Sequence, residues 1–134
     1  KPTEIVTAIV INQPDKKFSG VYVKLGRYKG EDLAQASVVV IATPKNNYRI
    51  AFGSVGPTPI RAIELEKLLN GKIPERETLE KSFSIIEKTV KPISDVRSTK
   101  EYRMHMCKVM FERGLLGSIE RLSGKGLPYG TSLI

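Results

Sequence analysis

This sequence of 134 residues has one cysteine (Cys107), one histidine (His105) and no tryptophan. One cysteine excludes an internal disulfide, and this cysteine usage suits a reducing cytoplasm. One cysteine and one histidine cannot build a zinc or iron–sulfur site, so we expect no metal centre here. No apolar run approaches the roughly 20 residues that a membrane-spanning helix needs. The sequence therefore predicts a cytoplasmic domain without a membrane segment.

Positive charge, in contrast, is abundant. Lysine and arginine number 22 against 14 acidic residues, which gives a net charge of +8. This balance favours an anionic partner: nucleic acid, a phosphorylated cofactor or an acidic protein surface. A soluble domain with many surface lysines explains it equally well. Aromatic residues, at 7%, are too scarce to favour a protein that stacks single-stranded bases. A non-catalytic nucleic-acid-binding module therefore remains the alternative function and is disfavoured.

The first half of the chain has the residue pattern of β-strands. β-Branched and apolar runs predict strands at residues 4–11, 21–25 and 37–43, and an alternating run predicts one at 48–53. The turn-forming residues at 44–47 join the last two runs into a hairpin.

The second half predicts three helices. Thr58 and Pro59 have the residue types of a helix start, and that helix would end at 70–71. A second helix spans about 77–90. A third begins at Ser98, where Ser98 and Glu101 form an S-x-x-E capping box, and continues to about Leu122.

Strands followed by helices predict an α+β domain, in which an antiparallel sheet of about three to four strands carries three helices on one face. We assign residues 1–123 to this domain and 124–134 to a flexible tail, because the tail carries three glycines and a proline.

No side chain in the sequence has the partners that catalysis needs. His105 lacks a Ser, Asp or Cys constellation, so a surface or packing role is favoured, and Cys107 is expected to be a small buried residue. Gly26 and Gly30 match neither G-x-G-x-x-G nor a P-loop. We therefore expect no catalytic residue and no metal ligand.

Three segments carry a more specific signal. The first holds Tyr22, Lys24 and Arg27 and leads through residues 32–34 (DLA) into a strand. The second is FGSVGPTPIRA at 52–62, and the third is PISDVRSTKEYR at 92–103. Together and in this order, they resemble the C-terminal domain of the FAD-binding subunit of the molybdenum hydroxylases, the carbon monoxide and xanthine dehydrogenase family.

The resemblance implies an oxidoreductase function that this chain shares with partners. In such subunits, FAD exchanges electrons with 2Fe–2S clusters in an iron–sulfur subunit, and a molybdopterin subunit transforms the substrate. The lysine at the position of Lys24 reaches toward the flavin, where an ammonium group can bind a carbonyl and stabilise the reduced ring. Arg27 and Asp32 are expected to be mostly structural, and Lys29 and Glu31 to be solvated.

The glycine-rich loops that hold FAD phosphates in this family have no counterpart in the sequence. The resemblance therefore implies that the N-terminal, FAD-binding half of the subunit supplies them, and that this domain alone is inactive. A purely architectural domain that bridges subunits without touching the cofactor remains a further alternative.

Overall fold

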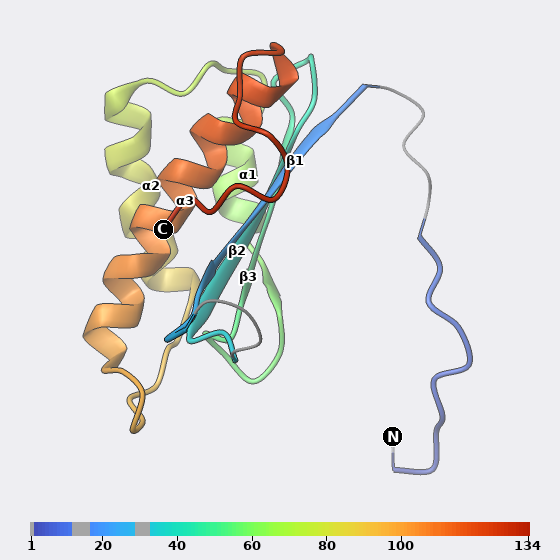
Figure 1. Cartoon of the computed structure of the whole chain (residues 1–134), viewed down its shortest axis with the longest axis vertical. Coiled ribbons are helices and arrows are strands. Elements are labelled where there is room, and N and C mark those ends of the chain that lie inside the picture. Colours follow the sequence, from blue (N-terminus) through green and yellow to red (C-terminus); the bar gives the residue numbers. More distant parts are fainter. Residues whose placement is uncertain (1, 12–16, 29–32) are drawn as a thin grey trace.

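The computed structural model describes residues 2–11, 17–28 and 33–134. Within them, four strands precede three helices: β1 (Ser19–Leu25), β2 (Ala36–Ala42), β3 (Tyr48–Gly53), β4 (Ile60–Arg61), α1 (Ile63–Leu69), α2 (Arg76–Thr89) and α3 (Lys100–Leu122). The strands form one antiparallel sheet in the order β1-β2-β3-β4. The helices lie on one face of this sheet (Figure 1), which confirms the predicted α+β architecture. No helix in the described ranges is long and apolar enough to cross a bilayer.

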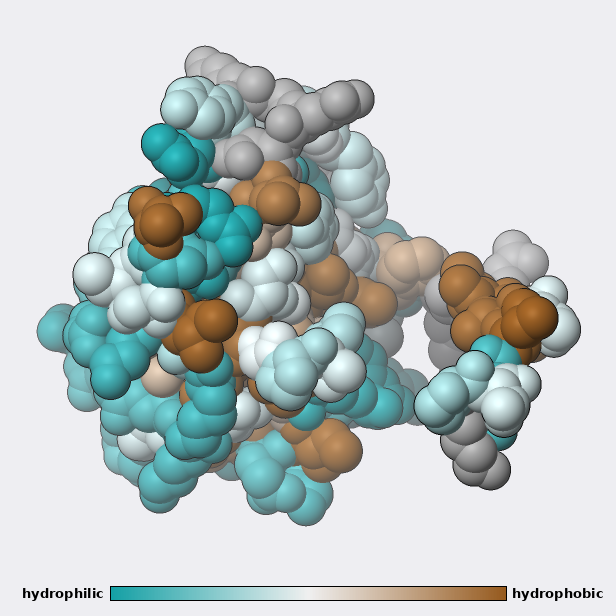
Figure 2. Space-filling model, turned by 90° about the horizontal axis from the view of Figure 1, so that it is seen from below, coloured by the Kyte–Doolittle hydropathy of each residue, from teal (hydrophilic) through white to brown (hydrophobic). Residues whose placement is uncertain are grey.

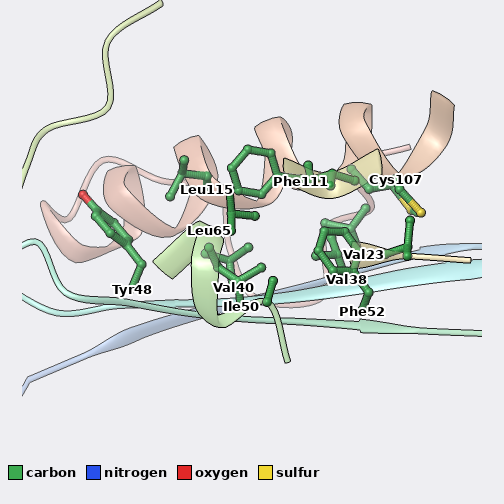
Figure 3. Packing of buried hydrophobic residues seen from close by; sticks show 14 of the residues in the cluster. Val23, Val38, Val40, Tyr48, Ile50, Phe52, Leu65, Cys107, Phe111 and Leu115 are labelled. Carbon is green, nitrogen blue, oxygen red and sulfur yellow. The ribbon is translucent and has the colours of Figure 1, made fainter. Parts of the chain in front are cut away.

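The hydrophobic core lies between the sheet and the helices. Alternate residues of the strands point to the helix side, so Val23, Val38 and Phe52 form one buried cross-strand row. Figure 3 shows Phe111 and Leu115 of α3 above these strands. Helix α3 packs on β1 and β2, α1 packs on β3, and α2 packs against α1 and α3.

The start of α1 differs from the sequence prediction. Thr58 and Pro59 do not begin a helix, because Ile60 and Arg61 pair with β3 as the short strand β4. The Ala62 N–H then donates to the Ile50 carbonyl at 2.9 Å. The helix begins only at Ile63 and has no side-chain cap. Pairing with the edge of β3 satisfies backbone groups that the predicted first turn would have left unpaired.

The start of α3 is displaced by one residue. Thr99, and not Ser98, is the N-cap, and its hydroxyl accepts from the Tyr102 N–H at 3.2 Å. The predicted capping box with Glu101 does not form, because the N–H and carbonyl of Ser98 both bond to the backbone of Asp95. Ser98 therefore belongs to the turn before the helix.

The predicted strand at residues 4–11 has no place in the sheet. No residue in the described ranges pairs with it as a strand, and it runs away from the body of the molecule (Figure 1). Its apolar side chains are exposed and do not belong to the hydrophobic core.

The C-terminal residues return along α3. The guanidinium of Arg121 donates to the carbonyls of Leu127 at 2.8 Å, Pro128 at 2.9 Å and Gly20 at 3.1 Å. It also lies 4.5 Å from the ring centroid of Tyr129. Arg121 thus joins this segment to β1, and the flexibility of residues 124–134 stays a prediction.

Candidate functional site

Lys24 lies near the end of β1, at an edge of the sheet. Val21 and Val23 are buried against the helices, so strand alternation places Lys24 on the opposite, helix-free face. Its cross-strand neighbour is Ser37, and the next residue in the same row is Gly53. Lys24 therefore belongs to a cross-strand row whose other two members are small residues.

Gly53 adds no side chain to this row. A Cβ at this position would lie 2.6 Å from the Ser37 hydroxyl oxygen, a distance that real side chains do not adopt. A glycine in a strand often marks a place where a ligand or another backbone approaches closely. The Ser37 hydroxyl therefore occupies the space that a side chain at position 53 would need, and Lys24 lies two strands away in the same row.

Two open hollows meet at Lys24. One, of about 780 Å³, lies between the end of β1 and α3, and its lining includes Lys24, Tyr28, Tyr102 and Arg113. The other, of about 750 Å³, lies on the outer side of β1 and β2 and is bordered by Tyr22 and the C-terminal residues. The lysine is therefore accessible from both sides of the sheet edge, and aromatic and basic groups surround it.

Lys24 also has no acidic partner among the described residues. Throughout the described ranges, its side chain forms no ion pair and no hydrogen bond. Arg27 differs, because its guanidinium lies 5.4 Å from the Tyr28 ring centroid and donates to the Tyr28 hydroxyl at 3.4 Å. Asp32, Lys29 and Glu31 fall outside the described residues, so their expected roles stay predictions. The charge of Lys24 is thus available to a group outside this chain.

Asp95 forms a second polar cluster in the PISDVRSTKEYR segment. Its carboxylate accepts from the Arg97 guanidinium at 2.6 and 3.1 Å, accepts from the Arg97 N–H at 2.8 Å, and pairs with Arg103 of α3 at 2.5 Å. Arg103 is only 3% exposed. The hydrogen bonds from Arg97, followed by that from Arg103, hold the pKa of Asp95 well below its usual range. This geometry ties the α2–α3 connection to α3, as expected of a structural cluster.

We expect the Asp95→Asn variant to be less resistant to urea than the wild type at pH 7, and the difference to shrink below about pH 4. The folded-state pKa of Asp95 is lowered, so its stabilisation is present above the unfolded-state value of ~3.9 and is lost as pH falls toward the folded value. Urea midpoints at pH 7, 4 and 2.5 measure this. The Glu77→Gln variant is the control, because Glu77 is an exposed carboxylate paired with Lys81. A difference independent of pH would contradict the prediction.

Glu66 is a buried acid that sequence reasoning missed. It accepts from the Ile50 N–H at 2.9 Å and from Arg61 at 2.8 and 3.0 Å, and Arg49 lies 3.5 Å away. Burial alone would raise the pKa of Glu66, but the hydrogen bonds from Arg61 and Ile50 lower it overall. Glu66 thereby fastens α1 to β3 and β4.

The remaining candidates have no catalytic geometry. His105 is exposed on α3, and Cys107 is fully buried, as expected. Burial raises the pKa of the Cys107 thiol to about 12, so it is not a nucleophile in the folded domain. Among the described side chains, no group of three or more His, Cys, Asp or Glu residues could hold a metal ion.

Comparison with known proteins gives consistent matches. The family described as "CO dehydrogenase flavoprotein C-terminal domain" matches residues 21–118. The carbon monoxide dehydrogenase medium chain of Afipia carboxidovorans is 34% identical over 119 residues, which cover 86% of this chain and 41% of that protein. The xanthine dehydrogenase FAD-binding subunit of Escherichia coli O157:H7 is 31% identical over 77 residues, or 58% of this chain and 26% of the relative.

The fold matches as well. A solved carbon monoxide dehydrogenase from Hydrogenophaga pseudoflava superimposes with a TM-score of 0.71 at 29% identity, over 78% of this chain and 37% of that one. The chain thus spans about two fifths or less of the length of these relatives.

Proposed function

Because this chain belongs to the family of CO dehydrogenase flavoprotein C-terminal domains, we propose that it is the C-terminal domain of the FAD-binding subunit of a multi-subunit molybdenum hydroxylase. In this role it helps to cover and tune FAD during electron transfer between iron–sulfur clusters and an external electron carrier. The observation that carries the proposal is Lys24, which has no ion pair or hydrogen bond among the described residues and lies where two open hollows meet, in a chain whose relatives include an FAD-binding subunit.

The described residues fit one end of FAD and not the other. The ammonium group of Lys24 is a donor suited to a flavin carbonyl, and the two hollows that meet at Lys24 are open. Within the described part of the chain, residues 53–57 form no comparable cradle for the phosphates. Residues 53–57 lead into β4 and not into a helix, so no helix N-terminus is available there. The phosphate end must therefore be held by the N-terminal half of the subunit.

Lys24 carries the chemical role of this chain. When bound, FAD supplies the electron-carrying chemistry. Lys24 would donate a hydrogen bond to the ring, and its positive charge would favour the reduced, more negative form of the flavin. The residues of this chain also exclude water from one side of the ring. The proposed partners are the N-terminal FAD-binding half, an iron–sulfur subunit with 2Fe–2S clusters and a molybdopterin subunit, in the cytoplasm.

Replacing Lys24 with alanine in the complete subunit should weaken flavin binding about tenfold and lower the flavin potential by roughly 30–60 mV. The tenfold loss corresponds to ~1.4 kcal/mol of interaction with the oxidised ring, and the potential change corresponds to a further ~1.4–2.8 kcal/mol with the reduced ring. Flavin retention on dilution and a spectroscopic redox titration measure the two effects.

Two further variants sharpen this experiment. Lys24→Arg keeps the charge and should retain most of the potential. Lys88→Ala removes an exposed charge from α2, on the helix side of the sheet, and should change neither quantity. If Lys24→Ala left affinity, potential and electron-transfer rate unchanged, Lys24 would have no flavin role, and the architectural alternative would be favoured.

The nucleic-acid-binding alternative gains no support. None of the relatives described above is named for nucleic-acid binding. Part of the basic charge on the helices is also neutralised locally, in the pairs Lys67–Glu64, Arg76–Glu80 and Lys81–Glu77. These pairs reduce the positive field that a nucleic-acid surface would need.

A further inference from the structure

A cavity of about 520 Å³ lies at the end of the molecule where several connections of the fold meet. Its walls come from residues 33–34 before β2, from the β3–β4 connection, from the α2–α3 connection and from the first turn of α3. Figure 2 shows the molecule from this end, where hydrophobic residues are set among hydrophilic ones. A volume of this size falls within the range of small-molecule sites. The cavity is therefore large enough for a small ligand.

Arg103 brings an unused hydrogen-bond donor into the wall of this cavity. Its side chain is only 3% exposed, and it lines the cavity from α3. The Nε atom of Arg103 is closed to solvent and has no hydrogen-bond partner among the described residues. Buried polar groups in proteins nearly always have a partner, and a charged donor left without one is destabilising. Arg103 therefore needs an acceptor that the described residues do not supply.

The neighbouring carboxylate of Asp95 is already fully used. It accepts two hydrogen bonds from the Arg97 guanidinium and one from the Arg97 N–H, and it pairs with Arg103 at 2.5 Å. Among the described residues that line the cavity, Lys91, Arg97 and Arg103 are cations, and Asp95 is the one acid. Three positive charges thus face one negative charge, which favours an anionic ligand.

Much of the remaining lining is apolar. Leu33, Ala34, Pro57 and Ile93 contribute hydrocarbon surface, and Leu33 and Ile93 are 73% and 69% exposed. An inorganic anion such as phosphate has no part that this surface would contact favourably. A carboxylate on an apolar body presents planar acceptor oxygens to a guanidinium and hydrocarbon to the apolar wall. The lining therefore matches a carboxylic acid better than an inorganic anion.

We propose that this cavity binds a small carboxylic acid with an apolar body, whose carboxylate accepts a hydrogen bond from Arg103 Nε. Lys91 forms no ion pair with a described residue, so its charge also attracts the ligand. Binding would satisfy the buried donor and would join the α2–α3 connection to the β3–β4 connection. The inference goes beyond the proposed function, because it requires neither FAD nor a partner subunit.

Benzoate is the probe, and benzamide, which has a similar shape without the charge, is its control. Titrations of the full chain at neutral pH, followed by amide chemical shifts in NMR spectra, should give a dissociation constant of about 1 mM for benzoate, as expected of a ligand with few atoms. The shifts should centre on residues 54–57 and 91–97 and on Arg103. Benzamide and inorganic phosphate should each bind at least about tenfold more weakly, because benzamide lacks the charge and phosphate lacks the apolar body.

Three variants test the two parts of the site. Ile93→Trp fills part of the cavity and should weaken benzoate binding at least about tenfold, and the chain should stay folded because Ile93 is exposed. Arg103→Lys keeps a positive charge for Asp95 but removes the Nε donor, and it should weaken binding about tenfold. Lys91→Gln should weaken binding about threefold and keeps the charge test available if Arg103→Lys does not fold. Ile73→Trp is the matched control, because Ile73 is 73% exposed and does not line the cavity, and it should bind like the wild type.

The proposal would be overturned by equal binding of benzoate and benzamide, or by phosphate binding as tight as that of benzoate. Benzoate affinity within twofold of wild type in both Ile93→Trp and Lys91→Gln would reject this cavity as the site. The absence of any shift at about 20 mM benzoate would reject a carboxylate site altogether. None of these results changes the expected flavin retention of the complete subunit, so the proposed function is tested separately.

Discussion

Replacing Phe111 with alanine should lower the free energy of unfolding by about 4 kcal/mol, the largest effect that we expect from a single substitution. Phe111 is fully buried on α3, between the helix and the sheet (Figure 3). Helix α3 is the element that covers β1 and β2, so the cavity would open at the main contact of the fold. A domain of this size has a total stability of ~5–15 kcal/mol, so the variant would be only marginally folded.

Urea denaturation followed by circular dichroism measures this loss. Phe111→Leu retains most of the apolar volume and should lose less than half as much. Leu116→Ala is the control on the same helix, because Leu116 is 41% exposed, and it should cost less than about 1 kcal/mol. A Phe111→Ala loss no larger than that of Leu116→Ala would mean that α3 does not pack on the sheet as described.

Replacing Gly114 with leucine should cost about 2–3 kcal/mol, the second largest effect. Gly114 lies where α3 approaches the sheet most closely: a Cβ there would be 3.3 Å from Val40 Cγ2 and 3.5 Å from Val23 Cγ2. A larger side chain would push the helix away from β1. Because Lys24 follows Val23 directly, we also expect weaker flavin retention in the complete subunit.

Alanine substitutions at two glycines of α3 separate helix propensity from packing. At Gly117, a Cβ would make only ordinary contacts, at 3.4 Å to Leu133 and 3.8 Å to Val21, so Gly117→Ala should gain up to about 1 kcal/mol. Gly114→Ala should gain less, because the closer valines oppose it. Equal stability changes at the two positions, together with a harmless Gly114→Leu, would contradict the close approach of helix and sheet. The denaturant midpoints of the variants measure these stability changes, provided that the m-value is the same for all of them.

The sequence predicted the elements whose residue pattern and packing agree. Strands β1 and β2 follow β-branched runs, β3 follows an alternating run, and α2 follows its apolar spacing to within one residue at each end. Strand β4 was missed because Thr58 and Pro59 have the residue types of a helix start. The decisive interaction, pairing of Ile60 and Arg61 with β3, is not local. The prediction at Ser98 was wrong because the backbone of Ser98 bonds to that of Asp95 in the turn before the helix.

The site was predictable to a lesser extent. Lys24 was identified by resemblance, and the structure adds its neighbours, Ser37 and Gly53, which are distant in sequence. Glu66 was not predictable, because a glutamate within a helix is ordinarily solvated, and its burial depends on Arg61 and on the Ile50 N–H across the fold. Residues that act through partners elsewhere in the fold leave little trace in local sequence.

The buried thiol of Cys107 can be used to measure how often α3 separates from the sheet. It is the only cysteine in the chain, it lies on α3 against the sheet, and its pKa of about 12 keeps it protonated at neutral pH. A thiol-specific alkylating reagent can therefore modify it only during excursions in which α3 separates from the strands. The rate of alkylation thus reports the frequency of that separation in a natural sequence, without any engineered label.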